Sequence, residues 1–176
     1  MSNILIIEDD RDIAEVERDY LIINGFNADI TDNGITGIDR VKQGDYDLVL
    51  LDLMLPGLDG FTVCKKLREI TDIPILTVTA RKEDIDKIRG LGLGADDYIE
   101  KPFSPNVLVA RVKANLAQYD RLRKNEEKKE NIIDIGDYKI NTSSRRVYKH
   151  GKEIELKNKE YELFLFLVMN ADIVFD

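Results

Sequence analysis

The sequence predicts an α/β fold, with helices on both faces of a parallel sheet, followed by a small antiparallel sheet and one helix. Up to residue 119, short apolar runs alternate with longer amphipathic segments, which is the order of strands and helices in such a fold. Three of these runs are nearly continuous in Ile, Leu and Val, as expected for strands covered on both faces. After residue 131 the apolar spacing is first strand-like and then, from Lys159, helical.

The five apolar runs of the first part are predicted as strands at residues 3–7, 27–31, 47–51, 74–78 and 97–100. Apolar residues at three- and four-residue spacings predict helices over 10–23, 33–43, 59–70, 83–91 and 104–119. Ser104 and Pro105 give the last of these helices an N-cap followed by proline at its first position. Gly25 fits the end of the first helix, because glycine readily adopts the left-handed conformation common there.

Charge divides the chain near residue 120. The formal net charge is −8, but residues 1–120 hold 14 basic and 23 acidic residues, whereas the remainder holds 12 and 11. Residues 120–131 are almost entirely charged or polar, which predicts a helix tail or a linker between a domain at 1–119 and a second part at 132–176. The longest apolar runs are too short to span a bilayer, the N-terminus lacks the pattern of a signal peptide, and a single cysteine excludes an internal disulfide. A cytoplasmic protein is therefore expected.

A single carboxylate, Asp52, follows the apolar run at 47–51. An unpaired buried charge costs several kcal/mol, so Asp52 needs a partner from elsewhere in the chain. In a parallel α/β sheet the carboxyl ends of the strands form the edge where ligands bind. The polar residues at those ends are Glu8, Asp9 and Asp10 after the first strand, Asp52 after the third, Thr79 after the fourth and Lys101 after the fifth.

These residue types suit the transfer of a phosphoryl group. Clustered carboxylates repel one another unless a cation lies between them, and carboxylates with water favour Mg²⁺ or Mn²⁺. Lys101 and Thr79 could then neutralise and hydrogen-bond phosphoryl oxygens, with Asp52 as the nucleophile. Each residue alone could instead be a helix cap or a solvated surface group, and the acidic run could simply favour a helix N-terminus. The combination at four strand ends favours the site, and a cis peptide bond between Lys101 and Pro102 would direct the lysine inward.

Four segments of the first part resemble the receiver domain of two-component response regulators, and the OmpR/PhoB subfamily in particular. They read ILIIEDD, DLVLLDLMLPGLDG, PILTVTA and GADDYIEKPFSP. The resemblance implies a flavodoxin-like, doubly wound, five-stranded sheet with strand order 2-1-3-4-5. It also implies that a sensor histidine kinase supplies the phosphoryl group and that the intact protein regulates transcription by binding promoter DNA.

The resemblance further assigns roles in the metal site. Asp52 would be the phosphoacceptor. Mg²⁺ would be held by Asp9, Asp52 and the backbone carbonyl of Met54, with Glu8 acting through water. Asp10 would be mainly a helix-entry residue.

The remaining roles concern the phosphoryl group and its lifetime. Lys101 would bind the phosphoryl group, and Thr79 and Tyr98 would form the switch pair, with the Tyr98 ring turning inward as Thr79 moves. Met54 and Arg81 would flank the path of the attacking water, and neither supplies a carboxylate or amide to orient it. Self-dephosphorylation is therefore expected to be slow.

In this subfamily the fourth helix, fifth strand and fifth helix form a symmetric dimer face with salt bridges. The residues available for it are Lys87, Asp96, Asp97, Arg111 and Lys113. Val107 stands where the subfamily usually has a glutamate, so Lys87 is expected to lack its partner. Dimerisation weaker than is usual for the subfamily is therefore predicted.

Residues 132–176 resemble the start of the subfamily's winged-helix DNA-binding domain. Turns are predicted at Gly136–Asp137, at residues 141–144 and at His150–Gly151. The helix that follows has an apolar stripe predicted at Tyr161, Leu163, Phe164, Leu167 and Val168. The family pattern continues with two more helices, the second of which reads the major groove, and a hairpin wing. Their absence predicts a truncated domain that does not bind DNA specifically.

The sequence leaves two other functions to consider. A phosphatase of the haloacid-dehalogenase type also uses an aspartyl nucleophile, but there the aspartate follows the first strand in a D-x-D pattern, and here Met54 stands two residues after Asp52. We therefore expect no enzymatic activity beyond the chain's own phosphotransfer and slow dephosphorylation. A stand-alone receiver that acts through protein contacts, without DNA, is the alternative.

Overall fold

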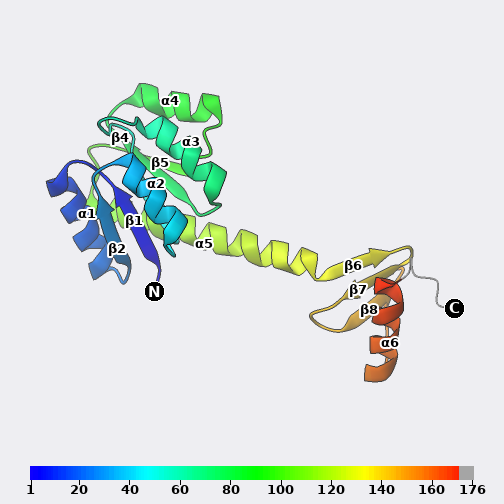
Figure 1. Cartoon of the computed structure of the whole chain (residues 1–176). Helices are drawn as coiled ribbons and strands as arrows, with labels where there is room; N and C mark the ends of the chain where they lie inside the picture. Colours follow the sequence, from blue (N-terminus) through cyan, green and yellow to red (C-terminus); the bar gives the residue numbers. More distant parts are fainter. Residues whose placement is uncertain (171–176) are drawn as a thin grey trace. The chain divides into compact units, whose positions relative to one another are not determined.

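The computed structural model describes residues 1–170, apart from the side chains of residues 88–91 and 127–130. The chain divides into two units, Met1–Asp120 and a second unit that begins at Arg121. The first contains a parallel sheet in the order β2-β1-β3-β4-β5 (Figure 1), which confirms the predicted fold class. Its strands are β1 (Asn3–Ile7), β2 (Asn27–Thr31), β3 (Leu48–Asp52), β4 (Ile75–Thr79) and β5 (Asp97–Glu100).

Helices cover both faces of this sheet. They are α1 (Arg11–Ile23), α2 (Gly34–Gln43), α3 (Gly60–Ile70), α4 (Lys82–Leu91) and α5 (Pro105–Glu130). Alternate residues of each central strand point to opposite faces. Thus Ile4 and Ile6 of β1 pack with α1 and α5, whereas Leu5 and Ile7 pack with α2 and α3. All five residues of β3 and of β4 are buried, as the continuous apolar runs predict.

Two strand ends differ from the prediction by one residue. β3 and β4 each run one residue further, so Asp52 and Thr79 are the last residues of their strands and are paired within the sheet. Backbone pairing therefore fixes the position of both side chains. α5 also continues past residue 119, so residues 120–130 are helical.

Local signals in the sequence explain the helix ends. Asp10 caps α1, because its carboxylate accepts hydrogen bonds from the backbone N–H groups of Asp12 and Ile13 at 3.0 and 3.2 Å. The helix-entry role expected for Asp10 is thus seen directly. The Ser104 hydroxyl accepts from the backbone N–H of Val107 at the start of α5. After α1, Gly25 adopts a φ of +88°, in the left-handed region.

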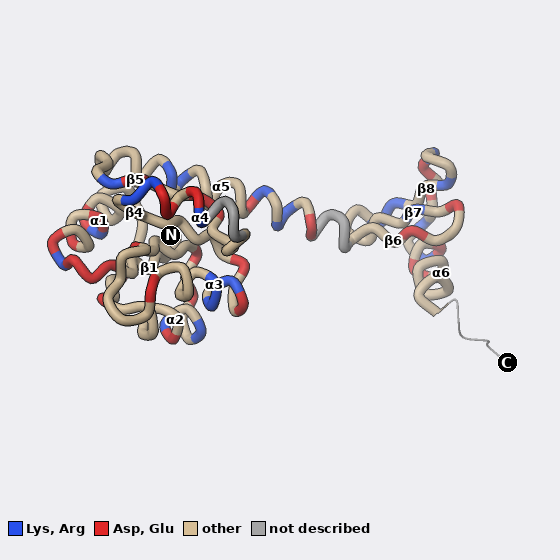
Figure 2. Tube along the Cα trace, turned by 90° about the horizontal axis from the view of Figure 1, so that it is seen from above, with Lys and Arg blue, Asp and Glu red and all other residues tan. Residues whose placement is uncertain are grey.

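The second unit begins with exposed helix and continues as a small antiparallel sheet. Residues 121–126 of α5 are all exposed and carry Lys, Arg and Glu (Figure 2). The sheet has the order β6-β7-β8-β9, formed by Ile132–Ile135, Tyr138–Asn141, Arg146–Lys149 and Lys152–Ile154. The predicted turns at Gly136–Asp137 and His150–Gly151 lie between its strands, and His150 and Gly151 adopt φ of +49° and +80°. The turn predicted at 141–144 lies one residue later, at 142–145, because Asn141 is the last residue of β7. One helix, α6 (Asn158–Met169), follows.

The apolar stripe of α6 differs from the prediction. Tyr161, Phe164, Leu165 and Val168 pack on the sheet around Ile140 and Val147. Leu163 and Leu167 were expected on this stripe but are 61% and 49% exposed. The packed residues follow the spacing i, i+3, i+4, i+7, so one helix face is selected and both leucines fall outside it. Among the described residues, no helix is both long and apolar enough to cross a membrane.

Gly60, the first residue of α3, lies against the backbone that follows Asp52. A Cβ atom at Gly60 would lie 2.4 Å from the Cα of Leu53 and 2.8 Å from the carbonyl oxygen of Asp52. We predict that Gly60→Ala lowers the free energy of unfolding by about 1–3 kcal/mol, because backbone must shift to admit the methyl group. Urea denaturation measures this change. The exposed Asn106→Ala should stay within about 0.5 kcal/mol of the parent chain, and equal stability of the Gly60 variant and the parent would contradict the close approach.

Candidate metal-binding site

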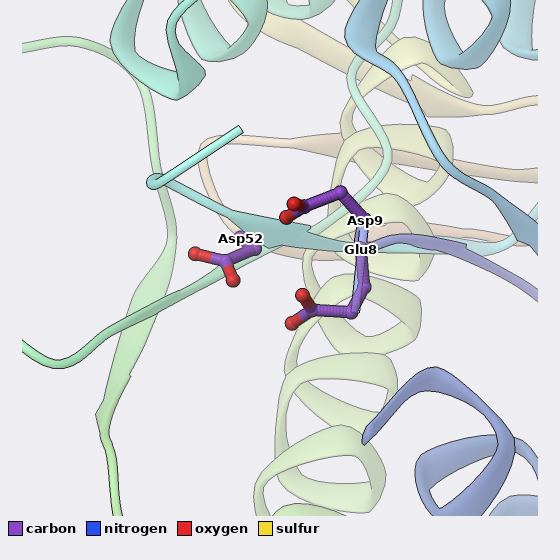
Figure 3. A group of neighbouring side chains, drawn as sticks. All are labelled: Glu8, Asp9 and Asp52. Carbon is purple, nitrogen blue, oxygen red and sulfur yellow. The ribbon is translucent and has the colours of Figure 1, made fainter. Parts of the chain in front are cut away.

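Three carboxylates meet at the carboxyl ends of two neighbouring strands. Glu8 and Asp9 directly follow β1, and Asp52 ends β3, which pairs with β1 in parallel. One carboxylate oxygen from each residue lies within 4.8 Å of the others, and the three groups face the same side of the strand ends (Figure 3). Glu8 and Asp52 are only 2% and 6% exposed, whereas Asp9 is exposed. The structure thus brings together the acidic residues that the sequence singled out.

Lys101, which follows the edge strand β5, forms salt bridges with two of these carboxylates. Its Nζ atom lies 2.8 Å from Oε2 of Glu8 and 2.8 Å from Oδ2 of Asp52. The Lys101–Pro102 peptide bond is cis. Burial opposes the charged ammonium, but the hydrogen bonds to Asp52 and Glu8 outweigh burial and raise the pKa of Lys101.

This crowding changes the acidity of Glu8. Its burial, followed by the hydrogen-bonded Asp52 carboxyl group beside it, raises the pKa of Glu8 to about 7, although Lys101 acts in the opposite direction. Oε1 of Glu8 also accepts the backbone N–H of Asp10 at 3.0 Å. Near neutral pH and without a metal ion, Glu8 is therefore protonated in a fraction of the molecules.

The donor atoms of the pocket fit a hard divalent cation. Oδ1 of Asp52 accepts the backbone N–H of Met54 at 2.8 Å, so the segment after β3 turns back over the carboxylate. Three clustered carboxylates supply oxygen ligands of the kind that Mg²⁺ and Mn²⁺ prefer, as does a backbone carbonyl. The predicted set of Glu8, Asp9, Asp52 and the Met54 carbonyl is therefore chemically suited to such an ion.

The Thr79 hydroxyl is hydrogen-bonded to Asp84, a partner that the sequence did not indicate. Its hydroxyl donates a hydrogen bond to Oδ2 of Asp84 at 3.0 Å and accepts one from the backbone N–H of Arg81 at 3.1 Å. Both Thr79 and Asp84 are buried. Tyr98, its predicted switch partner, lies half-buried on the neighbouring strand β5, opposite Thr77 in the register.

The acidic residues predicted for a dimer face form ion pairs within the chain. Arg68 donates to Asp96 at 2.6 Å, and Arg111 donates to Asp97 at 2.9 Å. Asn115 also donates to Asp97, at 2.9 Å. The other members of this group are more loosely placed: Nζ of Lys87 is 4.0 Å from Oδ1 of Asp84, and Lys113 is exposed on α5.

Sequence reasoning missed one buried acid near this pocket. Glu17 on α1 is 3% exposed, and its Oε1 has no hydrogen-bond partner among the described residues. It lines a cavity of about 550 Å³ that is otherwise largely apolar, between α1 and the start of α5. Burial, followed by the nearby Glu8, raises the pKa of Glu17 to about 8. The available signal was its position three residues after the buried Ala14 and four before the buried Leu21.

Several known proteins are similar to this chain in sequence and in fold. Residues 4–113 match the response regulator receiver domain. The chain is 38% identical to the uncharacterized transcriptional regulatory protein YclJ of Bacillus subtilis and 39% identical to the DNA-binding response regulator MtrA of Mycolicibacterium smegmatis. Each comparison covers 98% of this chain, and 76% and 73% of those proteins, respectively.

A solved structure extends the likeness to the second unit. The structure of DrrB, an OmpR/PhoB homolog from Thermotoga maritima, is similar with a TM-score of 0.57 and 32% identity, over 99% of this chain and 76% of that one. The chain belongs to the response regulator receiver family. Along nearly its whole length it is similar to transcriptional regulators of the OmpR/PhoB type.

The buried Glu17 predicts a specific dependence of stability on pH. Its pKa of about 8 in the folded chain exceeds the ordinary value of 4.5, so folding takes up a proton between these pH values. The stabilisation is fully present below about pH 4.5 and is lost as the pH rises to about 8. We expect the parent chain to lose stability relative to Glu17→Gln over this range, by up to about 1.4 kcal/mol per pH unit.

Urea denaturation of both chains at a series of pH values measures the difference. Because Glu8 is present in both chains, its own titration largely cancels in the comparison. Parallel stability curves for the two chains would show that Glu17 keeps an ordinary pKa in the folded state.

Proposed function

We propose that this chain is a phosphorylation-controlled response regulator, which accepts a phosphoryl group on Asp52 from a phosphohistidine of a sensor histidine kinase. The observation that carries the proposal is the arrangement of Glu8, Asp9 and Asp52 within 4.8 Å, with Lys101 at 2.8 Å from Asp52. Membership of the receiver family supports it.

The residues of the pocket suggest how the transfer occurs. An Asp52 oxygen forms a bond to phosphorus while the bond between phosphorus and the histidine nitrogen of the donor breaks. Lys101 and the backbone N–H of Met54 already hold the two Asp52 oxygens, so the carboxylate is oriented before the donor arrives. Glu8, Asp9, Asp52 and the Met54 carbonyl would hold Mg²⁺, which supplies positive charge to the phosphoryl oxygens.

The switch is proposed to involve Thr79 and Tyr98. The new phosphoryl group adds roughly one negative charge and three acceptor oxygens to Asp52. Thr79 then donates to a phosphoryl oxygen, and the Tyr98 ring turns toward the space that Thr79 leaves. The burial of Thr79 and its place at the end of β4, next to β3 in the sheet, support this assignment. The face formed by α4, β5 and α5 is thereby biased between two packings.

The phosphorylated protein is proposed to act on transcription. MtrA is a DNA-binding regulator by name, and the likeness to MtrA and DrrB continues into the second unit. We propose that the β6–β9 sheet and α6 belong to the domain with which the intact protein binds promoter DNA. A receiver that works through protein contacts alone is the alternative.

Phosphorylation of Asp52 is the direct test. We expect incubation with acetyl phosphate and Mg²⁺ to add the mass of one phosphoryl group to the intact chain, and to add nothing to Asp52→Asn. Intact-mass spectrometry measures both. Omission of Mg²⁺ should abolish most of the modification, because the carboxylates would then repel the incoming group. Equal modification of the Asp52→Asn chain would place the acceptor elsewhere and contradict the proposal.

The proposed dimer face gives a gain-of-function prediction. Val107 is 44% exposed on α5 and stands where the subfamily usually has glutamate, and the Lys87 side chain is 59% exposed on α4. We expect Val107→Glu to strengthen dimerisation of the beryllofluoride-treated chain by about two- to fivefold per salt bridge formed, as exposed ion pairs contribute less than about 1 kcal/mol. Sedimentation equilibrium measures the dimer dissociation constant.

Two controls sharpen this experiment. Val107→Gln has a similar size but no charge and should leave the dissociation constant near that of the parent. Salt should weaken the gain, because exposed ion pairs are screened. A parent chain that already dimerises at nanomolar concentration would contradict the prediction that its face lacks a salt bridge.

A further inference from the structure

Thr79, at the centre of the proposed switch, already uses the one proton that its hydroxyl can donate. The single hydroxyl proton goes to Oδ2 of Asp84 at 3.0 Å, and the oxygen accepts the backbone N–H of Arg81 at 3.1 Å. Thr79 is 0% exposed, so no solvent replaces either partner without a local rearrangement. A threonine hydroxyl has one proton to donate. It therefore cannot donate to Asp84 and to a phosphoryl oxygen at the same time.

Asp84 is as enclosed as the threonine that it binds. It is 4% exposed and lies in the first turn of α4, where its backbone N–H donates to the Arg81 carbonyl at 3.2 Å. Its second oxygen, Oδ1, lies 4.0 Å from Nζ of Lys87, one turn further along the helix. The carboxylate thus lies between the hydroxyl of Thr79 and a lysine of the proposed dimer face.

We propose that Asp84 is a positioning residue that competes with the phosphoryl group for the Thr79 hydroxyl, and so sets the fraction of the protein in the switched state. This inference rests on the proposed function. A hydrogen bond to a charged acceptor is stronger than one to a neutral acceptor. The hydrogen bond to Asp84 therefore stabilises the resting position of Thr79, and a phosphoryl oxygen must replace the Asp84 carboxylate as the acceptor.

The same carboxylate connects the switch to the surface. When Thr79 turns to the phosphoryl oxygen, Oδ2 of Asp84 loses its donor while it remains in a buried position. Lys87 is the charged neighbour toward which the released carboxylate can turn, because it is already 4.0 Å away. A change at Thr79 thereby alters the partner of a residue on α4, and no movement of the sheet is needed.

Binding of beryllofluoride, a phosphoryl analogue, to the full chain with saturating Mg²⁺ tests this role. ¹⁹F NMR measures the affinity. We expect Asp84→Ala to bind about tenfold more tightly, equivalent to about 1.4 kcal/mol. Asp84→Asn keeps the size of the side chain and a weaker, neutral acceptor, so we expect about threefold tighter binding. Asp86→Ala removes an exposed acid of the same helix and should change the affinity by less than about twofold.

A double-mutant cycle separates the proposed role from a general effect on α4. In a Thr79→Ala background, Asp84→Ala should no longer tighten binding, because the hydroxyl for which it competes is absent. The affinity for Mg²⁺ alone, measured by calorimetry, should stay unchanged. The inference is overturned if the Asp84 variants bind beryllofluoride like the parent, or if the gain persists without Thr79. Failure of the parent to bind, or binding by Asp52→Asn, contradicts the proposed function itself.

Discussion

The site depends on the two salt bridges that Lys101 forms with Glu8 and Asp52. Lys101 follows β5, and its ammonium reaches past β4 to carboxylates at the ends of β3 and β1. Removal of one member of a buried ion pair typically costs about 3–5 kcal/mol, because a charge is left without compensation. The order of the strands therefore matters to the chemistry of the pocket, since it places the lysine opposite both acids.

The pocket has more acidic groups than one lysine can neutralise. Glu8 responds by holding its proton up to about pH 7, and Glu17 holds its proton up to about pH 8. Metal ligands must be deprotonated, so protons and a divalent cation would compete for Glu8 in the proposed metal site. The proposed site would therefore retain a proton without metal and release that proton when a metal binds. A pocket of this kind needs no large rearrangement to change its charge.

Much of the pocket could be predicted from the sequence, because its residues lie at the ends of the sheet's strands. Continuous apolar runs locate the central strands, and the residue after each run must lie at the ligand-binding edge, which is why Asp52, Glu8 and Lys101 were found. The Asp84 contact could not be predicted, because an acid in the first turn of a helix is common whether or not it binds a side chain. Glu17 was missed because a single acid on an apolar helix face reads as a break in the pattern. Leu163 and Leu167 were misplaced because α6 is apolar on more than one face, and only packing selects the buried one.

Hydrogen-bond capacity gives the proposed switch two discrete states. Thr79 has one proton and two available acceptors, the Asp84 carboxylate at rest and a phosphoryl oxygen after transfer. Intermediate positions satisfy neither acceptor, and an unsatisfied buried polar group costs about 1–3 kcal/mol. In the proposed switch the threonine would therefore occupy one site or the other, and the population would depend on the difference between its hydrogen bonds to the two acceptors. In this proposal, a small difference between two strong interactions allows a single phosphoryl group to decide the outcome.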